Sequence, residues 1–212
     1  MQEQQEIPVY LFLGFLESGK TKFIQETFED ERFDSGERTL LLVLEEGEEE
    51  YDTSRFAVRD FEVAFLDPEE MTPEKLEELQ EKYRVERVCV EYNGMLELQK
   101  FFDAMPEGWA IAQVMTFFDA TTFLQYNKNM RQLVFDKVQY ADMVVFNRFR
   151  GEYSKEEYHK IVRGMTRRPG IVYEYLGGKA EYDEIVDPLP YDIDAPVIEI
   201  EDKDYAFFYR DL

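Results

Sequence analysis

The segment GFLESGKT, residues 14–21, constrains the fold of this chain more than any other. It fits the pattern G-x-x-x-x-G-K-[ST] at every fixed position. An apolar run typical of a buried strand, residues 8–13, precedes it, and a segment with apolar residues at helical spacing, residues 20–30, follows. Between a strand and a helix, the two glycines let backbone N–H groups of about residues 17–21 face inward as an anion site, and the helix adds its positive end. The segment therefore predicts a phosphate-binding loop.

Strand and helix patterns alternate along the rest of the chain. Short apolar runs predict strands at 39–44, 62–66, 87–92, 109–118, 142–146 and 170–175, and helical spacing predicts helices at 73–83, 95–105, 121–140 (with a break near Asn127) and 154–164. Thr72 is the expected N-cap before Pro73, and Ser154 opens a capping-box pattern. We predict an α/β fold of the P-loop NTPase class: a mostly parallel sheet with helices on both faces, in three layers.

The predicted domain covers residues 1–180, and residues 181–212 are expected to form a C-terminal extension or the start of a truncated second domain. The tail from Tyr182 carries three prolines and favours an extended crossing or a short edge strand.

Charge and cysteine content exclude several classes of function. The chain has 24 Lys and Arg against 47 Asp and Glu, a formal net charge of −23, so nucleic acid and anionic membranes are unfavourable partners. Its one cysteine, Cys89, lies mid-strand and is expected to be a buried hydrophobe rather than a ligand. No apolar run reaches the ~20 residues of a membrane helix and no secretory signal is visible, so the expected location is the cytoplasm.

The loop motif assigns roles to two side chains. Lys20 is expected to reach the β- and γ-phosphates of a nucleotide, and the Thr21 hydroxyl is expected to hold Mg²⁺. A nucleotide can bind a chain of this charge only where local donors and a cation overcome the overall repulsion.

Residues 7–28, IPVYLFLGFLESGKTKFIQETF, resemble the opening of CobW-type nucleotide-binding proteins, relatives of the UreG and HypB metallochaperone GTPases. Four further segments resemble family elements in the same order. Residues 44–48, with Asp52, resemble the switch segment, and residues 90–94 resemble the glutamate-x-x-glycine element. Residues 118–120 resemble a strand end of sequence valine-aspartate-alanine, and residues 139–148 resemble the strand that ends in asparagine-lysine. The resemblance extends over about residues 7–175.

The resemblance implies a set of site residues. Glu91 would act with Lys20 in catalysis and would bind the Mg²⁺ shell, with Thr21 and Glu45 as the other metal contacts; a polar strand end is the alternative for Glu91. Glu45 and Glu48 would belong to a switch that orders with Mg²⁺ and triphosphate, although the acidic run 45–50 could equally be a solvated loop. The implied nucleotide contacts are Gly14, Glu17, Ser18, Gly19, Lys20, Thr21, Lys22, Gly94, Asn147 and Arg148.

The chain departs from the family pattern at two places. Arg150 stands where GTPases carry the aspartate that accepts hydrogen bonds from guanine, and a guanidinium cannot accept one. Guanine selectivity is therefore open, unless a carboxylate such as Glu152 or Glu174 substitutes; Arg148 could still cover the base. Residues 53–75 contain no Cys or His, so the thiolate metal motif of the family is missing.

We weigh three functions. The first is Mg²⁺-dependent binding of GTP or another NTP with slow hydrolysis, a switch in metal homeostasis or metallochaperone-type work, with a homodimer or a client metalloprotein as partner. The second is a degenerate, non-hydrolysing scaffold that docks a partner. The third, phosphoryl transfer to a small molecule, would use Arg163, Arg167 and Arg168 as a lid.

His159, on a polar helix without a second His or Cys nearby, is expected at the surface.

Overall fold

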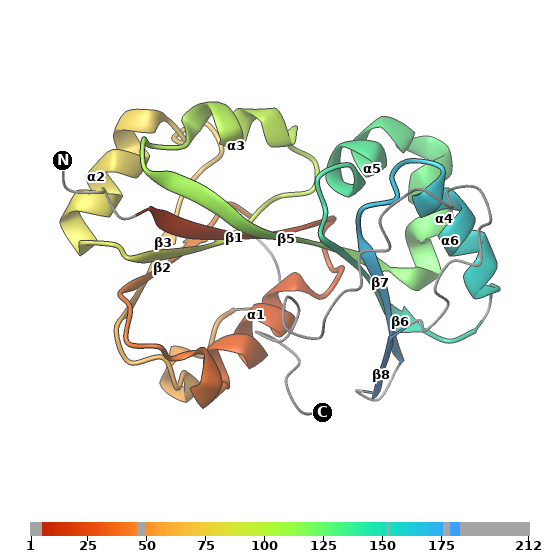
Figure 1. Cartoon of the computed structure of the whole chain (residues 1–212), viewed down its shortest axis with the longest axis horizontal. Helices are drawn as coiled ribbons and strands as arrows, with labels where there is room; N and C mark the ends of the chain where they lie inside the picture. The colour runs from red at the N-terminus through yellow and green to blue at the C-terminus, as the bar shows by residue number, and fades with distance from the viewer. Residues whose placement is uncertain (1–5, 46–49, 152, 176–178, 183–212) are drawn as a thin grey trace, which may run out of the picture.

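The computed structural model describes residues 6–45, 50–151, 153–175 and 179–182. The predicted tail from Tyr182 therefore lies almost wholly outside the described residues. Within them, eight strands form one sheet in the order β3-β2-β4-β1-β5-β6-β7-β8, in which β1 to β7 are parallel and β8 is antiparallel to β7 (Figure 1). The strands are β1 (Ile7–Gly14), β2 (Thr39–Val43), β3 (Phe61–Phe65), β4 (Arg87–Glu91), β5 (Trp109–Asp119), β6 (Met143–Phe149), β7 (Gly170–Tyr175) and β8 (Lys179–Tyr182).

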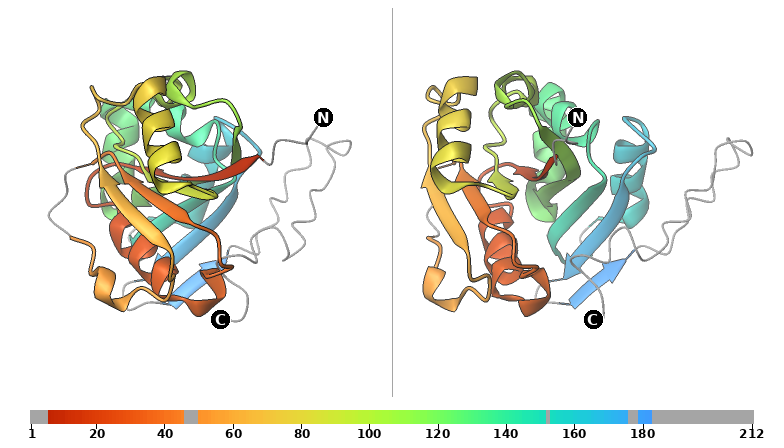
Figure 2. Two further views of the ribbon diagram at one scale, coloured as in Figure 1. Left: turned by 90° about the vertical axis from the view of Figure 1, so that its left-hand side faces the viewer. Right: turned by 60° about the vertical axis from the view of Figure 1, so that its left-hand side comes forward.

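Helices cover both faces of the sheet, as predicted. Two short 3₁₀ helices (Glu31–Phe33 and Thr53–Arg55) accompany the α-helices, which are α1 (Lys20–Glu29), α2 (Pro73–Tyr83), α3 (Leu98–Ala104), α4 (Ala120–Asn129), α5 (Arg131–Val138) and α6 (Lys155–Arg163). Helix α1 packs Ile24 and Phe28 on one face, whereas α2 to α6 pack on the other, so the molecule has three layers (Figures 1 and 2).

The core follows the alternation of side chains along each strand. In β1, Val9, Leu11 and Leu13 face α2 and α3, and Phe12 faces α1. Because each inner strand is buried on both faces, it is apolar at nearly every position, which explains the runs seen in the sequence. Cys89 is fully buried in β4, as predicted, and burial raises the pKa of its thiol to about 12.

Sheet register brings distant segments to one edge. Phe12 of β1 pairs with Glu91 of β4, and Glu91 also pairs with Val43 of β2. On the other side of β1, Gly14 pairs with Phe117, and Asp119 at the end of β5 pairs with Asn147. The carboxyl ends of these parallel strands therefore meet where β1 leads into the loop, the edge at which open α/β sheets bind ligands.

Four local predictions are wrong. Helix α3 begins at Leu98 rather than near residue 95, and the break between α4 and α5 falls at Met130 rather than Asn127. Ser154 is the N-cap of α6, but its side chain accepts no bond from the helix backbone; its hydroxyl instead donates to the Glu156 carboxylate. His159 is buried rather than exposed, since α6 turns this side chain against the Tyr173 ring.

Candidate phosphate-binding site

Residues 14–21 form a tight loop that needs glycine at two positions. Gly14 has φ +147° and Gly19 has φ +97°, in the region that L side chains rarely adopt. A Cβ on Gly14 would lie 2.3 Å from the Phe117 carbonyl oxygen, and one on Gly19 would lie 2.0 Å from Asn147 Nδ2. Glu17 has φ +59° without being glycine, a conformation that costs roughly 1–2 kcal/mol. The loop is thus held in close contact with β5 and the end of β6.

The Lys20 amine spans the mouth of this loop. It is buried, and it donates to the carbonyl oxygens of Gly14 (2.9 Å) and Phe15 (2.8 Å). It also forms a 2.7 Å ion pair with the buried Glu45 carboxylate. Burial raises the pKa of Glu45, against which the Lys20 charge and the Gly94 N–H bond act. A phosphate oxygen that binds Lys20 must therefore compete with Glu45.

Glu91 joins the loop helix to the segment after β2. The Thr21 hydroxyl donates to its Oε1 at 2.6 Å, and the Tyr51 hydroxyl donates to its Oε2 at 2.5 Å. Burial and the Glu91 charge raise the pKa of Tyr51 well above its ordinary value, so the phenol stays protonated and remains a donor. Sequence reasoning missed Tyr51; the only signal was an aromatic residue directly after the acidic run.

Gly94 lies against the backbone of the loop. A Cβ at this position would lie 2.4 Å from the Gly14 carbonyl oxygen and 2.7 Å from the Phe15 Cα. Only glycine allows this approach, and its N–H donates to Glu45. The segment between β4 and α3 therefore contacts the loop directly.

Asn147 and Arg148 hold the other flank of the loop. Asn147 Nδ2 donates to the Ser18 carbonyl at 3.1 Å, and the Arg148 guanidinium donates to the Glu17 carbonyl and to Asp119 (2.8 Å). Asp119 in turn accepts from Thr121 at the start of α4. The sequence matches Asp119 to a family element but does not indicate its bond to Arg148.

Some of the predicted site residues stand apart. Lys22 is exposed on α1 and lies 3.7 Å from Glu26 rather than in the loop. The Glu17 side chain is exposed, and Glu48 lies outside the described residues. Glu45 contacts Lys20 and Gly94, and neither Thr21 nor Glu91 bonds it.

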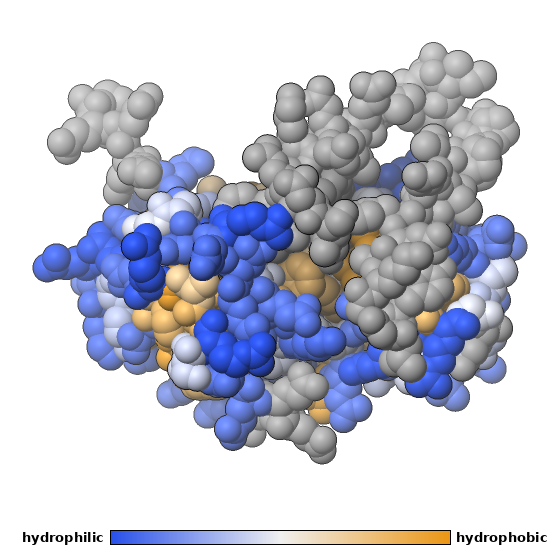
Figure 3. Space-filling model, turned by 90° about the horizontal axis from the view of Figure 1, so that it is seen from below, coloured by the Kyte–Doolittle hydropathy of each residue, from blue (hydrophilic) through white to orange (hydrophobic). Residues whose placement is uncertain are grey.

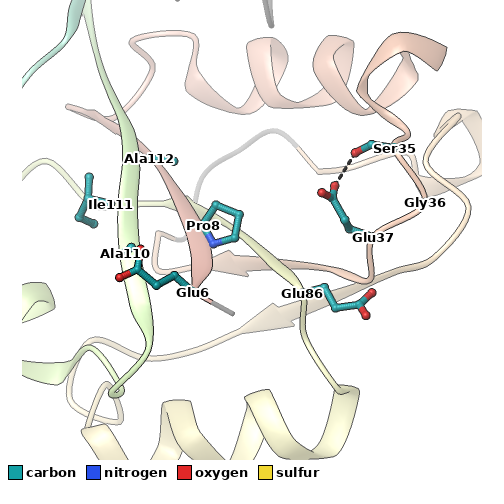
Figure 4. Close-up of a pocket in the computed structure, with 9 residues that line it drawn as sticks. All are labelled: Glu6, Pro8, Ser35, Gly36, Glu37, Glu86, Ala110, Ile111 and Ala112. Carbon is teal, nitrogen blue, oxygen red and sulfur yellow. Dashed lines mark hydrogen bonds between the residues drawn. The ribbon is translucent and has the colours of Figure 1, made fainter. Parts of the chain in front are cut away.

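Two cavities of about 630 Å³ lie at opposite edges of the sheet. One, beside Glu45, is lined by Val43, Phe65 and Asn93 among others, at the carboxyl ends of the strands. The other lies at their amino ends, where Glu6, Glu37 and Glu86 surround it and Ser35 bonds Glu37 (Figure 4). Three carboxylates disfavour an anionic ligand in the second cavity.

The loop fits a polyphosphate and a divalent cation. Ser18 Oγ is buried without a hydrogen-bond partner, and such a group is costly unless a ligand satisfies it. The Thr21 hydroxyl and the Glu91 carboxylate are oxygen groups of the kind that Mg²⁺ prefers, and both could belong to the coordination shell of such an ion. Among the described residues, no group of three or more His, Cys, Asp or Glu side chains could hold a metal ion by itself.

The parallel sheet and the glycine-bounded loop between β1 and α1 define a P-loop nucleotide-binding fold. Residues 8–168 match the model of the CobW/HypB/UreG nucleotide-binding domain, and the chain belongs to this family. Comparison with curated protein sequences finds no match.

Solved structures share the fold at low sequence identity. The Zn(II)-bound YjiA GTPase of E. coli is 18% identical with a TM-score of 0.58; the match covers 82% of this chain and 59% of YjiA, so this chain spans about three fifths of that protein. The hydrogenase maturation factor HypB of Archaeoglobus fulgidus is 15% identical (TM-score 0.56, 84% of this chain and 86% of HypB). FlhF complexed with GMPPNP and Mg²⁺ is 12% identical (TM-score 0.52, 84% of this chain and 71% of FlhF).

Proposed function

We propose that this chain binds GTP, or another nucleoside triphosphate, with Mg²⁺ and hydrolyses it slowly as a nucleotide switch. The observation that carries the proposal is the buried Lys20 amine at the mouth of the loop, next to the Thr21–Glu91 pair. The amine and the inward-facing amides bind the phosphate tail, and Ser18 Oγ gains a partner.

Mg²⁺, when bound, neutralises charge on the β- and γ-phosphates. Thr21 would contact the ion through its hydroxyl, and Glu91 would hold a water of its shell. In hydrolysis a water oxygen bonds to the γ-phosphorus, the bond to the β–γ bridging oxygen breaks, and the water proton passes to phosphate. The loop, residues 14–21, contains no arginine that could stabilise the charge that develops on the β–γ bridging oxygen, so a slow intrinsic rate of hydrolysis is expected.

The proposed switch depends on Lys20 and Gly94, which would contact the phosphates and which contact Glu45 in this structure. A γ-phosphate on Lys20 and on the Gly94 amide displaces Glu45 from both. Glu45 lies two residues after the end of β2, so its release removes contacts that hold the chain directly after β2. A role in metal handling is supported by the family alone. We place the protein in the cytoplasm, with a second copy of itself or a client metalloprotein as its partner. No described helix is long and apolar enough to span a membrane.

Isothermal titration with Mg²⁺ and GTP, and then ATP, tests the proposal. We expect Lys20→Ala to weaken binding by about 100-fold, because it removes charge-assisted bonds to phosphate. Lys100→Ala, an exposed lysine on α3, is the matched control and should bind like the wild type. Circular dichroism checks that Lys20→Ala is folded. Absent binding in the wild type, or equal binding by Lys20→Ala, would refute the proposal.

The alternative is a non-hydrolysing scaffold, favoured by the Glu45 contact that occupies Lys20. Single-turnover measurement of phosphate release separates the two functions. Release that depends on Glu91 supports the switch, and binding without release supports the scaffold.

A further inference from the structure

We propose that Glu174 recognises the base of the bound nucleotide and selects guanine, by accepting hydrogen bonds from the N1–H and N2–H groups. The inference rests on the proposed nucleotide function and names the residue that gives it specificity. Arg150, at the position where a base-reading carboxylate is expected, is exposed and can only donate.

Strand pairing brings Glu174 to the end of β6. Phe146 pairs with Tyr173, and the next pair along the strands joins Phe149 to Tyr175. Three steps along β6 thus match two along β7, so Asn147 and Arg148 both lie opposite Glu174. Such a bulge redirects side chains at the edge of a sheet.

Side-chain alternation turns Glu174 toward the loop helix. Val172 packs in the cluster under α1, whereas Tyr173 packs with α6 on the opposite face. Glu174 therefore shares the α1 face with Val172. Its electrostatic neighbours agree, since they are Lys22 and Glu26 of α1 and the Arg148 guanidinium. Lys22 directly follows the phosphate loop, so the carboxylate lies beside the place where the rest of a bound nucleotide leaves it.

The polar groups next to Glu174 bond one another, whereas no described residue bonds the Glu174 carboxylate itself. The Asn147 amide donates to Ser18 and its oxygen accepts from the Arg148 N–H (2.7 Å), and Asp119 bonds Arg148 and Thr121. Glu174 is half-buried and has neither a hydrogen bond nor an ion pair within the described part of the chain; burial raises its pKa. A half-buried carboxylate without donors is one that ligand donors would stabilise.

Guanine supplies those donors and adenine does not. Guanine presents two adjacent N–H groups on one edge, which a carboxylate can accept together. Adenine presents a ring-nitrogen acceptor beside its amino group, so its lone pair would face the carboxylate. Sites that hydrogen-bond a ligand in this way discriminate strongly against analogues that lack the donors.

Titration of the intact chain with GDP, inosine diphosphate (which lacks the 2-amino group) and ADP, each with Mg²⁺, tests the inference. We expect affinity to fall in that order for the wild type. Glu174→Gln should weaken GDP binding by about 10- to 100-fold and leave ADP binding unchanged. Glu26→Gln, which removes the same charge from the neighbouring helix, should keep the wild-type order.

A ligand that Glu174→Gln binds more tightly than the wild type does shows that the variant is still folded. Xanthosine diphosphate carries a carbonyl oxygen in place of the 2-amino group, and the glutamine amide can donate to it, so Glu174→Gln should bind it more tightly than the wild type does. Equal loss for GDP and ADP, an unchanged GDP preference in Glu174→Gln, or loss of that preference in Glu152→Gln alone would overturn the inference. If the wild type binds neither these diphosphates nor GTP, the proposed function fails as well.

Discussion

At the scale of single residues, Glu45 makes contacts that differ from the one the family resemblance implies. The family resemblance implies a metal contact, but the carboxylate bonds the Lys20 amine and the Gly94 N–H. These are the donors expected to meet a terminal phosphate. In this conformation Glu45 is therefore an internal anion, and under the proposed function a triphosphate would have to displace it from both donors.

We predict that Glu45→Gln binds triphosphate about 10-fold more tightly than the wild type in the absence of Mg²⁺. The substitution removes both the competing ion pair and the repulsion of a buried carboxylate, and about 1.4 kcal/mol corresponds to tenfold. Titration with a fluorescent GTP analogue in EDTA measures the change. Glu50→Gln, an exposed residue at the end of the acidic run, serves as the control and should have no effect. Weaker binding by Glu45→Gln would contradict this role.

At the scale of elements, the strand–loop–helix unit could be predicted because its determinants are local. Glycines at positive φ, apolar runs and the Thr72 cap, which bonds the Lys75 N–H, all lie within a few residues of what they determine. The start of α3 could not be predicted, because remote contacts fix it. Lys137 of α5 donates to the Leu96 carbonyl, and Asp136 accepts from the Leu98 N–H. Periodicity within residues 95–105 contains no trace of α5.

Lys137→Met should cost about 3–5 kcal/mol of the free energy of unfolding. The Lys137 side chain is fully buried and pairs with Asp136, so its loss leaves that carboxylate without its cation and removes the amine that donates to the Leu96 carbonyl. Urea denaturation at neutral pH gives the value, and Lys128→Met, an exposed lysine of α4, should change it little. A loss below about 1 kcal/mol would mean that the pair does not hold the start of α3.

At the scale of the whole molecule, charge and site oppose each other. On the face that carries α1, the described surface is largely hydrophilic, with several patches of hydrophobic residues between the hydrophilic ones (Figure 3). With a net charge of −23, the long-range field repels a nucleotide that the loop attracts at short range. The sequence alone shows this conflict, and it also indicates that Lys20, Glu91 and Asn147 lie near the loop. The Tyr51–Glu91 bond and the position of Glu174 beside Lys22 and Arg148 depend on the placement of distant segments, which no single segment contains.

We therefore expect the association rate of nucleotide to rise with salt. Between about 0.01 M and 0.15 M ionic strength the screening length falls from about 30 Å to about 8 Å, which weakens the distant repulsion more than the buried contacts. Stopped-flow mixing with a fluorescent nucleotide, at fixed free Mg²⁺, measures the rate. A rate that falls with salt would indicate that a local basic field dominates the approach.

The contact between Gly94 and Gly14 has a mechanical consequence. Main chain touches main chain there, with a separation that excludes even one methyl group. No flexible side chain lies between the two segments to absorb a displacement. Any displacement of the turn after β4 toward the loop must therefore move Gly14 by nearly the same amount, so Gly94 and Gly14 move together.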